Sequence, residues 1–121
     1  MVSDIREETM RGKLSLEASS AIEDAFRAEA AASLGRVETI LMEKLRMMNA
    51  ANARVLDVLK RPTRDVPDLL AAVEAFNKAQ QEAYDARMDL IIQRDSAGFS
   101  ADNMTQVSER YPIPPQKRVR I

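Results

Sequence analysis

The chain has 121 residues, of which 45% are apolar and only 4% are aromatic, and its net charge at pH 7 is −1. It contains no cysteine and no histidine, which excludes disulfides, thiolate metal sites and the side chain that most often serves as general base or metal ligand. The near-neutral charge gives no global electrostatic reason to expect nucleic acid as a partner.

The first predicted element is a polar lead-in over residues 1–14. Ser3 is positioned to cap a short helix, which Gly12 is expected to end. Residues 15–60 are predicted to form one long helix, since Ser15 is a suitable N-cap and the segment holds no proline. Its richness in alanine, leucine, methionine, glutamate and arginine favours the helical state.

Apolar residues in the second half of this helix recur with the alternating three- and four-residue spacing of a coiled-coil seam. Further apolar residues beside the seam widen the stripe, so packing against more than one partner helix is expected. The single polar residue of the seam, Asn52, either specifies the register or lies at the edge of the seam. The predicted interaction seam consists of Leu34, Leu41, Leu45, Met48, Asn52, Val55 and Leu59.

A turn is predicted from residue 61 to residue 65, because Pro62 cannot continue a helix. Residues 66–97 then form a second long helix, with Pro67 in its first turn and Gly98 just after its end. A connection of about five residues places the two helices antiparallel. The predicted contacts join Leu45, Met48, Val55 and Leu59 of the first helix to Leu69, Val73, Phe76 and Tyr84 of the second.

Residues 100–121 are predicted to hold a short third helix and an extended basic tail. Ser100 is the expected cap of the helix, and Met104 and Val107 are its expected apolar contacts. Three prolines within four residues favour the polyproline II conformation, and the tyrosine and isoleucine among them favour docking, on this chain or on a neighbour, over disorder. The candidate interaction residues of the tail are Tyr111, Pro112, Ile113, Pro114, Pro115, Lys117 and Arg118.

The sequence therefore predicts an all-α protein: a long antiparallel, coiled-coil-like helical hairpin with a short third helix and an extended, proline-rich, basic C-terminal tail. Three parts are expected, namely the lead-in (1–14), the hairpin domain (15–99) and the helix with the tail (100–121). Two helices cannot cover so wide an apolar stripe, so we expect a non-catalytic protein-interaction or structural role. The protein would be a scaffold or a small subunit of a larger assembly, with protein partners, either copies of itself or other subunits, and no cofactor or metal.

Two other functions stay open. The basic end of the tail would bind nucleic acid or another acidic surface, and such binding weakens steeply with salt. A small helical enzyme is the third reading, since chorismate mutases of the all-helical type work with arginine, lysine and glutamate side chains. Leu45-Arg46, followed by Arg54 and Arg61, invites that comparison, but the acid pair expected next falls on Asn49-Ala50, so the spacing does not match.

The sequence also predicts the compartment. No apolar run approaches the roughly 20 residues of a membrane-spanning helix. The first thirteen residues lack the apolar core of a signal peptide and carry three acidic side chains, which a transit peptide avoids. We therefore expect an intracellular protein, cytoplasmic by default, with an organelle as the open alternative.

Overall fold

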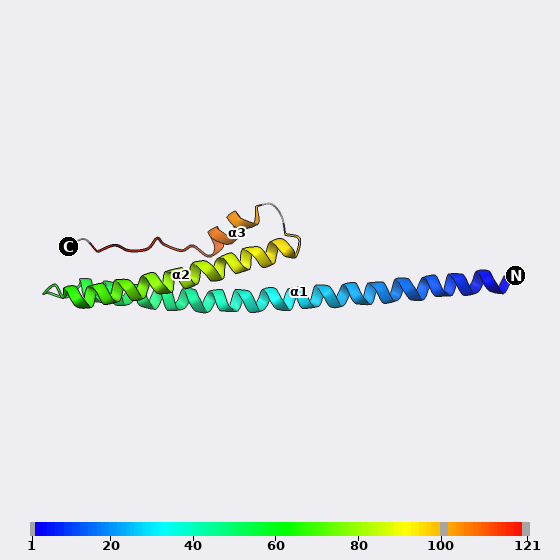
Figure 1. The fold of residues 1–121 in the computed structure, drawn as a ribbon, viewed down its shortest axis with the longest axis horizontal. Coiled ribbons are helices and arrows are strands. Elements are labelled where there is room, and N and C mark those ends of the chain that lie inside the picture. Colours follow the sequence, from blue (N-terminus) through cyan, green and yellow to red (C-terminus); the bar gives the residue numbers. More distant parts are fainter. Residues whose placement is uncertain (1, 100–101, 120–121) are drawn as a thin grey trace. The chain divides into compact units, whose positions relative to one another are not determined.

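The computed structural model describes the backbone of residues 2–99 and 102–119, and the side chains of residues 17–99 and 102–119. These residues form three helices and no strand: α1 (Val2–Leu59), α2 (Val66–Ser96) and α3 (Asn103–Arg110) (Figure 1). The predicted all-α class is confirmed. The chain divides into two units, Met1–Ser33 and Leu34–Ile121, and α1 contributes residues to both.

The start of α1 differs from the prediction. The helix begins at Val2 rather than at Ser15, and it continues through Gly12. A single glycine costs a helix only about 1 kcal/mol, and most residues on either side of it are good helix formers. Gly12 therefore does not end the helix. The proposed division of the chain after residues 14 and 99 stays a prediction.

In the second unit, α2 packs against the part of α1 that begins at Leu34. The two helices run in opposite directions there, as two ion pairs between them show (Figure 1). Lys44 of α1 lies 3.5 Å from Glu82, whereas Arg54, further along α1, lies 3.2 Å from Asp68, near the start of α2.

Both ends of α2 follow from local sequence. At its start, the Asp65 side chain accepts a hydrogen bond from the backbone N–H of Asp68 at 3.1 Å, with proline in the first turn. At its end, Gly98 has a φ of +87°. The N–H of Phe99 donates to the carbonyl of Arg94 at 3.1 Å, and the N–H of Gly98 donates to Asp95 at 3.1 Å. This pair of bonds is the Schellman motif that glycine permits.

Two apolar clusters fill the second unit. The turn-side cluster lies near the connection between α1 and α2, and the far cluster lies toward α3. The turn-side cluster contains Met48, Val55, Val58, Leu69, Ala72, Val73, Phe76 and Ala83. The far cluster contains Leu41, Ala86, Leu90, Ile91 and Val107.

Helix α3 packs on α2, and its buried side chains are Asn103 and Val107. Val107 is buried in the far cluster as predicted, but Met104 is exposed. The buried residue at its start is Asn103, which is only 1% exposed. Its amide donates to the carbonyl of Ile91 at 3.0 Å and to the Asp95 carboxylate at 2.8 Å. The predicted cap, Ser100, lies outside the described residues.

Candidate functional site

Six of the seven predicted seam residues occupy three partly or fully buried environments in the second unit, and the seventh, Leu59, is exposed. Leu41, Met48 and Val55 are buried in the two clusters, and Leu34 and Leu45 are partly buried against them. Asn52 is half-buried and belongs to neither cluster. These side chains therefore pack within the chain, and an interaction of the seam with another molecule stays a prediction.

Leu59 and Tyr84 are the two residues of the predicted helix contact that do not join the core. Leu59 is 56% exposed, and the residue before it, Val58, is buried in the turn-side cluster instead. Tyr84 is also exposed, and the Arg87 guanidinium lies 5.5 Å from the centre of its ring. The residues just before them, Val58 and Ala83, are buried. Each step along a helix rotates the side-chain direction by about 100°, so Leu59 and Tyr84 lie at the margin of the α1–α2 contact.

The first unit carries an exposed apolar surface on α1. Ile22 is 57% exposed and Phe26 is 72% exposed. Together with Ala25 and Glu29 they line a shallow surface hollow, because residues three, four and seven apart share one face of a helix. Every side chain from residue 17 to residue 33 is exposed or half-exposed.

The C-terminal segment, residues 111–119, is extended and lies along α2 in the second unit (Figure 1). Ile113 and Val119 pack against the turn-side cluster, and Tyr111 packs against the far cluster. Lys117 is half-buried, and its ammonium lies 4.8 Å from the centre of the Phe76 ring. The remaining candidate residues of the tail are exposed: Pro112, Pro114, Pro115 and Arg118.

Polar side chains of α2 hold the backbone of this segment. Asn77 accepts a hydrogen bond from the N–H of Lys117 at 2.7 Å and donates one to its carbonyl at 2.9 Å. Gln80 donates to the carbonyl of Pro114 at 3.1 Å, and Arg87 donates to the carbonyl of Tyr111 at 3.1 Å. The extended backbone thus obtains hydrogen bonds without a neighbouring strand.

The hydroxyl of Tyr111 connects the segment to α1, because it donates to the carboxylate of Glu38. Burial, this hydrogen bond and the negative charge of Glu38 raise the pKa of the Tyr111 phenol above its usual value. Arg110 lies 3.7 Å from the same carboxylate. The phenol therefore stays protonated and serves as a donor throughout the neutral range.

Sequence reasoning missed the residues that hold the tail and α3. Asn77, Gln80 and Asn103 read as ordinary helical polar residues, yet Gln80 and Asn103 are buried and Asn77 is half-buried. Asn77 and Gln80 are spaced one turn apart, beside Phe76 and Val73 of the core face. Amides on the margin of an apolar helix face are the one available signal, because a buried amide needs partners.

The arginines of the enzyme comparison all face carboxylates. Arg46 binds Glu43 on the surface of α1, and Arg54 and Arg61 both bind Asp68. The hydrogen bond from Arg61 and the charge of Arg54 keep the pKa of the Asp68 carboxyl below its usual value, although desolvation opposes them. These three arginines therefore meet acids of the chain on its surface.

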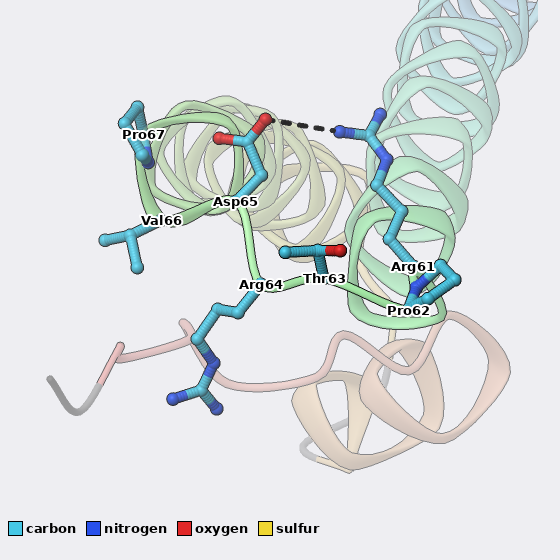
Figure 2. Close-up of a pocket in the computed structure, with 7 residues that line it drawn as sticks. All are labelled: Arg61, Pro62, Thr63, Arg64, Asp65, Val66 and Pro67. Carbon is cyan, nitrogen blue, oxygen red and sulfur yellow. Dashed lines mark ion pairs between the residues drawn. The ribbon is translucent and has the colours of Figure 1, made fainter.

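The two arginines of the turn between α1 and α2, Arg61 and Arg64, extend in different directions (Figure 2). Figure 2 shows the Arg61 guanidinium directed at Asp65, 3.7 Å away, while the Arg64 side chain extends toward the C-terminal segment. Arg64 also lines a pocket together with Lys117, Arg118 and Val119 of that segment. Arg61 therefore pairs with the acids at the start of α2, whereas Arg64 lies on the side of the basic tail (Figure 2).

Within residues 17–99 and 102–119, no three carboxylates converge in a way that would hold a metal ion. None of the described helices combines the length and the apolar character needed to cross a membrane. Comparison of the chain with known proteins finds no matching family model, no matching curated protein and no matching solved structure.

Proposed function

We propose that the protein is a non-catalytic interaction protein, either a helical scaffold or a small subunit of a larger assembly. In this proposal α1 and α2 of the second unit form an antiparallel, coiled-coil-like hairpin that the proline-rich tail braces. The exposed face of α1 in the first unit, made by Ile22, Ala25 and Phe26, binds the partner.

The observation that carries the proposal is the exposure of Ile22 and Phe26 on one helical face. Burying a large apolar side chain contributes about 1.5–3 kcal/mol, and an exposed pair on one face leaves that contribution unused. Isolated helices are marginal in water because most of their stability comes from packing. The segment of α1 from residue 17 to residue 33, whose side chains are all exposed or half-exposed, is accordingly suited to pairing with a second helix.

The test is a comparison of two charge-matched double variants. Ile22→Glu/Phe26→Glu places two carboxylates on the proposed face, whereas Ser20→Glu/Ala31→Glu places two on the opposite, exposed face of the same helix. Light scattering and sedimentation over the micromolar range measure self-association. Affinity capture from the native source, with mass spectrometry, compares the partners of both variants with those of the wild type.

We expect the wild type to associate with itself or with a defined partner, the first variant to lose that association, and the control to keep it. A wild-type chain that stays monomeric and captures the same proteins as the Ile22→Glu/Phe26→Glu variant would contradict the proposal.

Binding of nucleic acid through the basic tail is the weaker alternative. It receives less weight because Lys117 lies over the Phe76 ring and Arg110 faces Glu38, which leaves Arg118 as the exposed, unpaired cation of residues 110–119. Its test is the salt dependence of binding to a mixed-sequence oligonucleotide, where phosphate contacts give a steep decrease in affinity.

A further inference from the structure

A pocket of about 310 Å³ lies in the second unit, between the end of α1, the start of α2 and the end of the C-terminal segment. This volume falls at the lower end of the range of small-molecule sites, about 300–1,000 Å³. Its lining divides into an aliphatic group and a cationic group. The aliphatic residues are Val55, Leu59, Val66, Leu69, Val73 and Val119, and the cationic residues are Arg64, Lys117 and Arg118.

The positive charge of the pocket is not neutralised within the described part of the chain. Arg64 and Arg118 are exposed, and neither side chain has an ion pair or a hydrogen bond among residues 17–99 and 102–119. The acids at this end are already engaged: Asp65 faces Arg61 and caps α2, and Asp68 faces Arg61 and Arg54. Among the residues that the structure describes, no acid lines the pocket itself.

The walls of the pocket are held in place by contacts away from it. Lys117 is fixed by both hydrogen bonds of its backbone to Asn77, and Val119 packs against the turn-side cluster. Val55, Leu69 and Val73 are buried members of that same cluster. A pocket with walls already ordered binds at a lower entropic cost than one that must form on binding.

We propose that this pocket binds a small amphipathic carboxylate, with the chemistry of a medium-chain fatty acid. The hydrocarbon body lies against the aliphatic walls, where it leaves water. The carboxylate accepts hydrogen bonds from the guanidinium groups of Arg64 and Arg118, because the paired N–H donors of a guanidinium match the two oxygens of a carboxylate. A nucleotide fits this lining less well, because none of the described lining residues is aromatic and could stack on its base. The proposal is independent of the interaction face on the first unit.

The experiment measures binding of decanoate to the full chain by isothermal titration calorimetry and native mass spectrometry, below the concentration at which decanoate forms micelles. Decanol and decylammonium serve as probes with the same body and a neutral or cationic head. We expect saturable binding of one decanoate per chain, with decanol at least about tenfold weaker because it cannot form the charge-assisted bonds. Decylammonium should not bind.

Variants test the assigned residues. Arg64→Gln/Arg118→Gln should weaken decanoate binding at least about tenfold and leave decanol binding unchanged. Leu59→Asp, at an exposed wall position, should weaken the binding of decanoate. The control Arg27→Gln/Arg46→Gln removes the same charge from exposed positions elsewhere. This control and the Ile22→Glu/Phe26→Glu variant should bind decanoate as the wild type does.

Several results would overturn the proposal. Equal affinity for decanoate and decanol would assign binding to apolar contact alone, and unchanged affinity in Arg64→Gln/Arg118→Gln would place the ligand elsewhere. Loss of binding in the Ile22→Glu/Phe26→Glu variant would assign it to the first unit. Saturable binding of a short acidic peptide with aliphatic side chains, in the absence of decanoate binding, would show that the pocket serves a protein partner instead.

Discussion

The Asn77 side chain pairs with both the N–H and the carbonyl of Lys117, so one amide replaces two backbone partners. Asn77→Ala should lower the free energy of unfolding by about 1–3 kcal/mol, since each bond contributes about 0.5–1.5 kcal/mol. It should also accelerate hydrogen exchange at the Lys117 amide. Urea denaturation and exchange measured by NMR test both effects.

Two further variants make this prediction specific. Asn77→Asp keeps the acceptor for the Lys117 N–H but removes the donor to its carbonyl, so an intermediate loss is expected. Lys78→Ala changes the exposed neighbouring position and should alter stability by less than about 0.5 kcal/mol. Equal stability of all three variants would show that the tail is not held at Asn77.

The hydroxyl of Tyr111 should make the stability of the second unit depend on pH in the alkaline range. Its pKa in the folded chain is raised by burial and by its bond to Glu38, so the folded chain holds this proton more tightly than the unfolded chain. The stabilisation that the protonated phenol gives the folded chain is therefore complete below about pH 10, the usual pKa of tyrosine. It is lost as the pH rises through the pKa of Tyr111 in the folded chain.

Tyr111→Phe removes this titration and should reduce the slope of stability against pH in the alkaline range. Urea denaturation of the wild type and the variant at a series of pH values gives the two slopes. At neutral pH the variant should be less stable by about 1 kcal/mol, the typical value of one hydrogen bond. Identical slopes would mean that the phenol titrates as it does in an unfolded chain.

At the scale of elements, Gly35 within α1 and Gly98 just beyond the end of α2 should respond oppositely to substitution by alanine. A Cβ at Gly35 in α1 meets no atom within 4 Å, so Gly35→Ala should stabilise the chain by about 0.5–1 kcal/mol. Gly98 ends α2 with a φ of +87°, where an L-residue costs about 1–2 kcal/mol, so Gly98→Ala should destabilise it. Thermal unfolding of the two variants gives both signs, and a shared sign would contradict this account.

The C-terminal segment should stabilise the helices on which it lies. Deleting residues 111–121 removes the partly buried side chains of Tyr111, Ile113 and Val119 from the two clusters. Each kcal/mol lost lowers the melting temperature of a domain of this size by about 4–8 °C, so a decrease of several degrees is expected. Calorimetry measures the melting temperatures of the full chain and the deletion variant. An unchanged value would mean that these contacts contribute nothing to stability.

At the scale of the whole molecule, the proposed association should make stability depend on concentration. A partner that binds only the folded state raises the melting temperature as its concentration rises. If the partner is a second copy of the chain, circular dichroism should show melting temperatures that increase with protein concentration. Phe26→Ala should flatten this dependence, whereas a wild-type melting temperature independent of concentration would exclude self-association.

Local signals accounted for most of the helix boundaries. Pro67 and Gly98 marked the two ends of α2 correctly, because capping and backbone conformation depend on residues close in sequence. The predicted start of α1 was wrong, because the prediction treated Gly12 as the end of a helix although one glycine costs a helix little. Burial at the ends of elements was less predictable, as Leu59 and Met104 show.

The all-helical class, the turn at Pro62 and the apolar positions Leu41, Met48 and Val55 could all be predicted from the sequence, because periodicity and propensity are properties of neighbouring residues. Three features depend instead on tertiary packing: Asn77 holds Lys117, Asn103 of α3 is buried against α2, and Arg64 lines one pocket with the end of the tail. Those contacts join residues far apart in sequence. Their partners depend on how helices and tail pack, which no local pattern of side chains specifies.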